Sequence, residues 1–170
     1  MNTKQQRAII YVDGFNLYYG ALKDTPSTKW LDLERFFLML RNEDDVVQIN
    51  YFTTQAGGQA SRKDQLTYLT ALSTRPLIEI IEGRFKPKSV RCRVRGCQYS
   101  GDRTFTRLEE KRTDVNIAVR MLEDAVDDRC DLFVLVSGDS DLVPAVQTIK
   151  RRYPAKKIRN CLAPSPRFLP

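Results

Sequence analysis

Acidic side chains follow two apolar runs of this chain, and carboxylates are groups that bind metal ions and move protons. Asp13 comes directly after residues 8–12, and Asp139 and Asp141 come just after residues 132–136. We expect both runs to be buried strands of one sheet. Open α/β sheets bind ligands beyond the carboxyl ends of their strands, where the strand order reverses, so these carboxylates are expected to converge.

A fourth carboxylate, Asp114, stands at the start of the helix expected to lead into the second of these strands. Like charges gathered in one place need compensation, and oxygen-only ligands suit Mg²⁺ or Mn²⁺. Asn16 and Ser137 could add a neutral oxygen or orient a metal-bound water. Each residue also has a plainer explanation. Asp139 and Asn16 can cap helices, and Asp114 can favour its helix dipole.

The composition excludes several kinds of catalysis. The chain has 170 residues, enough for one compact domain, and no histidine. Serine–histidine triads, histidine general bases and His-ligated zinc or iron sites are therefore excluded. The 28 Lys and Arg against 21 Asp and Glu give a net charge of +7, which favours a polyanionic partner.

The positive charge is concentrated in two segments. Residues 84–112 and residues 150–167 each carry a net charge of +7, so the remainder of the chain carries −7. One explanation is a solvated surface with chance clustering. The other is an acidic site that needs cations, bordered by phosphate-binding segments.

Apolar strands that alternate with amphipathic helices predict a Rossmann-like, open, mostly parallel α/β sheet flanked by helices. Four helices are expected: one over 33–40 after Asp32, one between Gly57-Gly58 and Pro76, one with Thr113 as its N-cap, and one that carries Leu142, Val146 and Ile149. The apolar stripe of the third helix is expected to be Val115, Ala118, Val119, Leu122 and Val126. The strands are expected at residues 8–12, 46–52, 77–81, 132–136 and, at an edge, 157–162.

A basic hairpin is expected to interrupt this pattern at about residues 88–108. In residues 90–96 every second residue is arginine, so a strand would place Arg91, Arg93 and Arg95 on one face. Residues 104–107 could pair with it. The arginines either defend an exposed edge against aggregation or contact phosphates as guanidinium forks.

Four cysteines are too few for a disulfide scaffold at this length, so a reduced, cytoplasmic setting is expected. Cys92 and Cys97 could supply half of a structural Zn²⁺ site, completed by another loop or a second chain. Cys130 and Cys161 are expected to be small buried apolar residues. The longest apolar runs have five residues, so neither a membrane span nor a secretory leader is expected.

Three segments resemble the NYN domain, in its bacterial LabA-like branch, within the PIN-like nuclease superfamily. They are residues 11–17 (YVDGFNL), 109–116 (EEKRTDVN) and 136–142 (VSGDSDL), which occur in the family's order and spacing. The resemblance covers nearly the whole chain. It implies a Rossmann-like domain with a Mg²⁺- or Mn²⁺-dependent ribonuclease centre. The substrate we expect is single-stranded RNA that follows the arginine-rich strand.

The resemblance also assigns residues. Asp13, Asp114 and Asp139 match the family's acidic positions, with Asp141 and Asn16 beside them. Many relatives carry an acid where this chain has Arg120, and Asp124 is expected to substitute in part. The residues expected to bind RNA are Arg91, Arg93, Arg95, Arg103, Lys111 and Arg112, and Tyr99 or Phe105 could stack on bases.

Two other readings of the sequence remain open. The chain could be a non-catalytic RNA-binding or regulatory module that keeps the acidic pocket, or a Toprim-like nuclease, although Toprim domains carry Glu where this chain has Asp13. Residues 1–163 are expected to form a single domain, and residues 164–170 a loose tail. A homodimer is compatible with the sequence.

Overall fold

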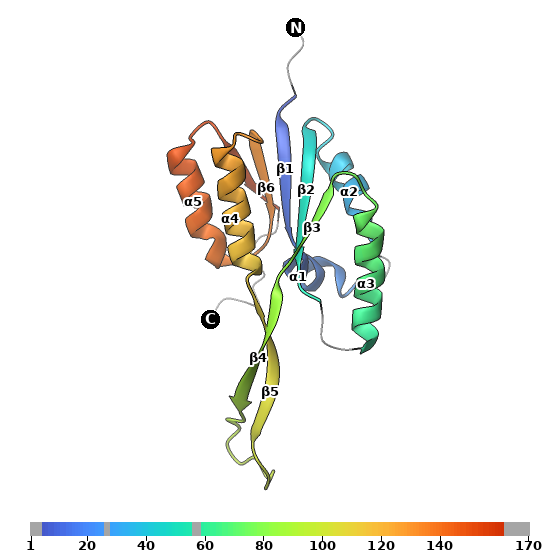
Figure 1. Ribbon diagram of the computed structural model, residues 1–170, viewed down its shortest axis with the longest axis vertical. Coiled ribbons are helices and arrows are strands. Elements are labelled where there is room, and N and C mark those ends of the chain that lie inside the picture. The colour runs from blue at the N-terminus through green and yellow to red at the C-terminus, as the bar shows by residue number, and fades with distance from the viewer. Residues whose placement is uncertain (1–4, 26–27, 56–58, 162–170) are drawn as a thin grey trace.

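Five parallel strands form the central sheet of the computed structural model, which describes residues 5–25, 28–55 and 59–161. Their order is β3–β2–β1–β6–β7, so the order reverses between β1 and β6 (Figure 1). This confirms the predicted parallel α/β sheet. The strands are β1 (Arg7–Asp13), β2 (Asp45–Thr53), β3 (Ile78–Glu82), β6 (Leu132–Val136) and β7 (Lys157–Asn160).

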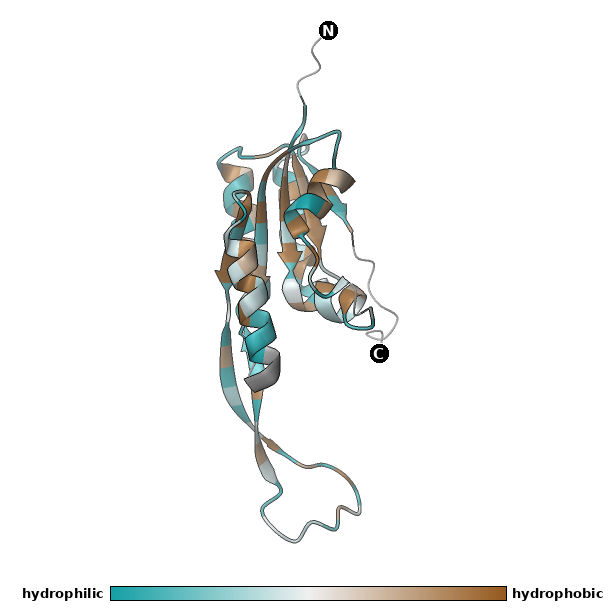
Figure 2. Cartoon of the chain, turned by 90° about the vertical axis from the view of Figure 1, so that its right-hand side faces the viewer, coloured by the Kyte–Doolittle hydropathy of each residue, from teal (hydrophilic) through white to brown (hydrophobic). Residues whose placement is uncertain are grey.

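Helices cover both faces of this sheet, with α4 and α5 on one side and α2 and α3 on the other (Figure 1). Alternate residues of β1 point to opposite faces. Ala8, Ile10 and Val12 therefore pack with α2 and α3, whereas Ile9 and Tyr11 pack with α4 and α5. In Figure 2 the sheet strands are predominantly hydrophobic. The helices are α2 (Leu33–Leu40), α3 (Gln59–Ser73), α4 (Thr113–Val126) and α5 (Val143–Arg152).

Short helical turns follow the two strands at the reversal point. After β1 come α1 (Gly14–Leu17) and a π-helical turn, η1 (Tyr18–Leu22), and after β6 comes a 3₁₀ turn, η3 (Ser140–Leu142). Gly14 is required there, because a Cβ atom would lie 2.8 Å from both the Phe52 carbonyl oxygen and the Tyr51 hydroxyl oxygen.

The buried stripe of α4 differs from the prediction. Ile117, Met121 and Ala125 are fully buried, whereas Val115, Val119 and Val126 are exposed. The helix carries apolar residues on two adjacent stripes, and helical periodicity alone does not choose between them. The N-cap also differs: Arg112 precedes the helix in a left-handed conformation (φ 84°), and Thr113 is its first residue.

The basic insertion is a two-stranded antiparallel ribbon that extends away from the body (Figure 1), built from β4 (Arg84–Arg91) and β5 (Thr104–Lys111). It is longer than predicted, because it extends beyond residues 88–108 at both ends. The predicted arginine face is wrong, because β4 ends at Arg91 and leaves Arg93 and Arg95 in the connecting loop. Gly96, with a φ of 77°, lies in the turn that follows.

Two predictions fall on residues outside the described ranges: the break at Gly57-Gly58 and the tail at residues 164–170. The edge strand predicted over 157–162 is observed as β7, which ends at Asn160. Cys130 is buried as predicted, but Cys161 is exposed because it follows that edge strand. Within the described ranges, no helix is both long and apolar enough to cross a membrane.

Candidate active site

Asp13 is held at the carboxyl end of β1 by four hydrogen bonds. Its Oδ1 accepts from the backbone N–H groups of Phe15 (3.1 Å) and Asn16 (3.0 Å). Its Oδ2 accepts from Asn16 Nδ2 and from Ser137 Oγ (3.1 Å). The carboxylate therefore caps α1 and also connects β1 to the end of β6. The proximity to β6 expected from the sequence is present, but the residue that caps α1 is Asp13 and not Asn16.

Asn16 and Ser137 connect the two strand ends. Asn16 Oδ1 accepts from Gly138 N–H (3.1 Å), and Ser137 Oγ accepts from Asp139 N–H (3.1 Å). Asp139 caps the next turn by accepting from Asp141 N–H at Oδ1 (2.9 Å). This network positions Asp139 beside Asp13 across the point where the strand order reverses.

Asp114 lies close enough to these carboxylates to be affected by their charge. The pKa of Asp114 is raised to about 6. Partial burial is the largest cause, and the charges of Asp139, Asp13, Glu110 and Asp141 also contribute. The structure thus brings Asp114 into one electrostatic neighbourhood with the acids of β1 and β6.

Sequence reasoning missed Glu110, the last acid before α4. Burial raises its pKa, and the charge of Asp13 contributes. Its Oε1 accepts hydrogen bonds from Thr54 Oγ1 (3.1 Å) and from Thr113 Oγ1. No sequence pattern points to Glu110, because its position depends on the length and register of the ribbon.

The donor set suits a hard divalent cation, although the acids are not gathered into a ready ligand cluster. Within the described ranges, no group of three or more Asp, Glu, Cys or His side chains is arranged to hold a metal ion. Asp13 already accepts about as many hydrogen bonds as a carboxylate has lone-pair sites. The side-chain carboxylates of Asp114 and Asp141, in contrast, have no hydrogen-bond or ion-pair partner among those residues. Their uncompensated charge and oxygen donors fit Mg²⁺ or Mn²⁺.

The two family positions on α4 lie apart from this site. Asp124 is buried, accepts a hydrogen bond from Tyr11 Oη (2.7 Å) and pairs with Arg129 (2.9 Å). Arg120 pairs with Glu79 (2.7 Å) and lies 3.5 Å from an Asp124 oxygen. Asp124 does not substitute for the missing acid, because its oxygens are used in a packed network between α4 and β1.

The six basic residues predicted to bind RNA are spread along the ribbon. Arg91 ends β4, Arg93 and Arg95 lie in the loop, and Lys111 and Arg112 lie at the base near Asp114; all are exposed. Arg103 instead supports the loop by donating to the carbonyl oxygens of Cys97 (2.9 Å) and Tyr99 (3.4 Å). Lys111 pairs with Glu109 (3.1 Å).

The antiparallel register identifies a basic face of the ribbon that the sequence did not reveal. Directly paired residues share a face, and alternate residues do so along each strand. The paired residues Arg84 and Lys111, Lys86 and Glu109, and Lys88 and Arg107 therefore lie on one face. A hollow of about 850 Å³ beside the ribbon is lined by residues of both strands, Lys88, Arg91 and Arg107 among them.

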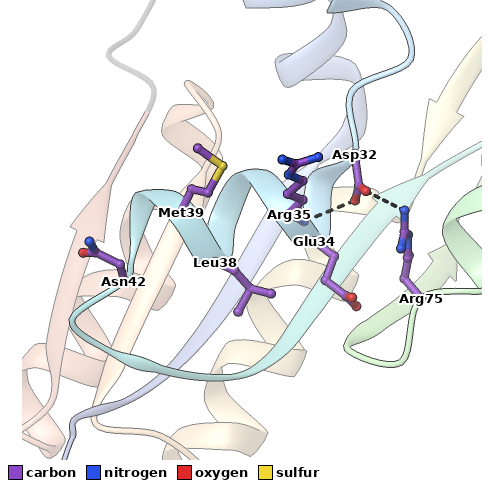
Figure 3. A pocket seen from close by; sticks show the side chains of 7 residues that line it. All are labelled: Asp32, Glu34, Arg35, Leu38, Met39, Asn42 and Arg75. Carbon is purple, nitrogen blue, oxygen red and sulfur yellow. Dashed lines mark hydrogen bonds and ion pairs between the residues drawn. The ribbon is translucent and has the colours of Figure 1, made fainter.

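Among the residues that the structure describes, neither the cysteines nor the hollow beside α2 provides a group of metal ligands. Cys92 and Cys97 are free thiols, and no third ligand joins them within the described ranges. Another hollow lies beside α2 (Figure 3). There Asp32 accepts a hydrogen bond from Arg35 N–H (3.2 Å) and pairs with Arg75 (2.5 Å), as the dashed lines in Figure 3 show. The carboxylate of Asp32 thus caps α2 and is neutralised by Arg75.

Known proteins resemble this chain in sequence and in fold. A family model of the NYN domain matches residues 7–165. The 6-hydroxy-3-succinoylpyridine 3-monooxygenase HspA of Pseudomonas putida is 30% identical over 185 aligned residues, covering 88% of this chain and 57% of that protein. The chain thus spans little more than half of that relative. A protein of unknown function from Vibrio parahaemolyticus has the same fold, with a TM-score of 0.58 at 22% identity, covering 94% of this chain and 83% of that one. Because the family match extends over most of its length, the chain belongs to the NYN domain family of the PIN-like nuclease superfamily.

Proposed function

We propose that this chain is a metal-dependent ribonuclease that hydrolyses phosphodiester bonds of single-stranded RNA. The observation that supports it most is the electrostatic coupling of Asp114 to Asp139 and Asp13, whose charges, together with partial burial, raise the pKa of Asp114 to about 6. Membership of a nuclease family also supports the proposal. The uncompensated negative charge at the edge of the sheet is what a cation-dependent site requires.

The proposed roles follow from the contacts of each side chain. Asp114, Asp139 and Asp141 would hold the cation, and Asp13 would join them if Asn16 or Ser137 released one of its oxygens. A bound Mg²⁺ or Mn²⁺ would lower the pKa of a water molecule bound to it and offset the negative charge on the phosphate oxygens. This chain supplies that chemistry without histidine.

The residues around the carboxylates orient the reacting groups. Asn16 and Ser137 hold the two strand ends in register, and Asp141 would position the attacking water. Lys111 and Arg112, at the base of the ribbon, would stabilise the charge that develops on the phosphate. The expected products carry a 5′-phosphate and a 3′-hydroxyl.

The substrate would be guided by the ribbon. Its basic face and exposed loop arginines offer several cations to a phosphate backbone, and single strands have unpaired bases that the site can reach. Unlike a duplex, a single strand can bend from the ribbon into the acidic edge.

Three alternatives differ in their support. A non-catalytic RNA-binding module is favoured by the four hydrogen bonds that already occupy Asp13. We do not extend the pyridine monooxygenase activity named for the P. putida relative, because the chain spans 57% of that protein and its acidic edge suits phosphate chemistry. The NYN family match sets the Toprim-like alternative aside.

The test is a cleavage assay with labelled single-stranded RNA, single-stranded DNA and duplexes, in Mg²⁺, Mn²⁺ or EDTA. We expect metal-dependent cutting of single-stranded RNA, lost in Asp139→Asn and kept in Asp127→Asn, whose exposed carboxylate ends α4 away from the site. Tight, salt-sensitive binding without cutting by the parent would instead identify the binding module.

A further inference from the structure

A small cavity lined mainly by aromatic residues adjoins the acidic edge and has no role in the proposed hydrolysis. Its volume is about 210 Å³, below the roughly 300–1,000 Å³ typical of sites for drug-sized ligands. Gly14 and Phe15, which line it, follow Asp13 directly, and the Phe15 N–H donates to Asp13 Oδ1 (3.1 Å). The cavity is therefore built on the same turn that holds Asp13.

The rings that line the cavity are arranged in contact with one another. Phe15 stacks on Tyr19 with ring centroids 6.1 Å apart, and Trp30 meets Tyr68 edge-on at 6.3 Å. Tyr19 and Trp30 are 57% and 52% exposed. Two large rings that face solvent beside a site contribute little to the core and offer planar surfaces for a stacking ligand.

A lysine ammonium group lies over each of these two exposed rings. Lys23 Nζ lies 5.4 Å from the centroid of Tyr19, and Lys29 Nζ lies 5.8 Å from that of Trp30. Lys29 also pairs with Asp64 (2.8 Å), which places a carboxylate acceptor at the cavity. Stacking rings with positive charge beside them are the combination that binds successive bases and phosphates of a single strand.

Phe15 also joins the cavity to the ribbon. Its ring meets that of Phe85 in β4 edge-on at 6.4 Å. Phe85 pairs in the ribbon with Glu110, whose pKa is affected by the charge of Asp13. The ribbon base, the carboxylates and the cavity are thus contiguous, and a strand guided by the ribbon to the acidic edge would meet the cavity next.

We propose that this cavity binds one unstacked nucleobase of the single-stranded substrate, held against Tyr19 and Trp30. The proposal rests on the proposed function, because it assigns a base-binding subsite to the same ribonuclease. It places the stacking surface beside Asp13 rather than at Tyr99 or Phe105 of the ribbon.

Trp30 is the only tryptophan of the chain, so its fluorescence reports on the cavity directly. The full chain in EDTA is titrated with a short oligoadenylate and with a sugar-phosphate oligomer of equal length that lacks bases. We expect the oligoadenylate to quench Trp30 and the abasic oligomer to leave it unchanged. Equal quenching by both oligomers, or none by either, would overturn the proposal.

Variants separate the cavity from the ribbon. Tyr19→Ala should weaken oligoadenylate binding about ten-fold, the loss expected for one stacking ring. Tyr19→Phe keeps the ring and should bind as the parent does. Tyr99→Ala, which removes an exposed ring of the ribbon loop, should also bind like the parent. A Tyr19→Ala affinity equal to the parent's would refute the base subsite.

The outcomes also distinguish this proposal from the ribonuclease itself. Base-dependent quenching without any cleavage in Mg²⁺ would refute the hydrolytic function and keep the subsite. Metal-dependent cleavage that is indifferent to Tyr19→Ala, without base-dependent quenching, would refute the subsite and keep the hydrolysis.

Discussion

The carboxylate of Asp13 accepts four hydrogen bonds, whereas that of Asp114 has no such partner within the described ranges. Both belong to one acidic neighbourhood. The first is therefore stabilised by the protein itself, and the second carries a charge that the fold leaves uncompensated. The charge of Asp114 is therefore one that protonation or a bound cation would relieve.

The pKa of Asp114 is raised from 3.8 to about 6 in the folded chain, so its ionisation destabilises the native state as pH rises through that interval. In EDTA above pH about 6, Asp114→Asn should melt roughly 2 °C higher than the parent, corresponding to ~1 kcal/mol after discounting for partial exposure. Below about pH 4 the difference should vanish. Melting curves across pH test this, and a lower midpoint for the variant above pH 6 would contradict it.

Gly14 allows the chain to turn closely past β2. In Gly14→Ala the new methyl group would meet a backbone oxygen at 2.8 Å, so we expect a loss of about 1–3 kcal/mol of unfolding free energy. Gly20→Ala is the matched control, because no atom lies within 4 Å of its added Cβ, and helical propensity should raise stability slightly. Denaturant unfolding of both variants measures the contrast, which fails if the two respond alike.

At the level of elements, the strands and the acids that follow them were predictable because continuous apolar runs end at Asp13 and just before Asp139. Glu110 was not, because its place depends on the length of the ribbon. The ribbon's ends were misjudged because alternating arginines resemble a strand, whereas the chain turns near Gly96 instead. The basic face of the ribbon depends on the register between β4 and β5, which could not be predicted from the sequence.

The ribbon forms its own two-stranded sheet, so its loop can be changed without disturbing the core. Replacing residues 92–103 with Asn-Gly joins the paired residues Arg91 and Thr104 by a short turn and removes three arginines. We expect an unchanged melting temperature and weaker binding of single-stranded RNA. The slope of the logarithm of the binding constant against the logarithm of salt concentration should become less steep by about two.

The contrasting variant is Lys88→Ala with Arg107→Ala, which neutralises two paired cations on the ribbon's basic face. A loss of affinity in this double variant with none in the loop replacement would assign RNA binding to the strands. That result would reject the predicted roles of Arg93, Arg95 and Arg103.

Asp124 shows how α4 is fastened to the sheet. It is buried and receives the Tyr11 hydroxyl and the Arg129 guanidinium. Asp124→Ala would leave those donors unpaired and should cost about 2–4 kcal/mol of unfolding free energy. Cleavage by the fraction that remains folded should persist, because Asp124 lies outside the acidic neighbourhood. Calorimetry together with the RNA assay tests this, and a stable but inactive variant would return Asp124 to the site.

Across the whole molecule, the reversal of strand order between β1 and β6 explains why acids far apart in sequence act together. Neighbouring parallel strands end at one edge of the sheet, and the helix that precedes β6 begins at the same edge with Asp114. The ribbon and the aromatic cavity both adjoin that edge through Phe15 and Glu110. Polyanion binding, hydrolysis and base stacking are thereby proposed for one contiguous surface.

The most direct test of the acidic edge is Mn²⁺ binding, followed by electron paramagnetic resonance of the free ion. The parent chain should bind Mn²⁺, and Asp127→Asn should bind it as tightly as the parent. Asp139→Asn should bind Mn²⁺ more weakly by a factor of about ten. A parent chain that leaves all Mn²⁺ free, or an Asp139→Asn variant that binds it as tightly, would contradict a cation-dependent centre.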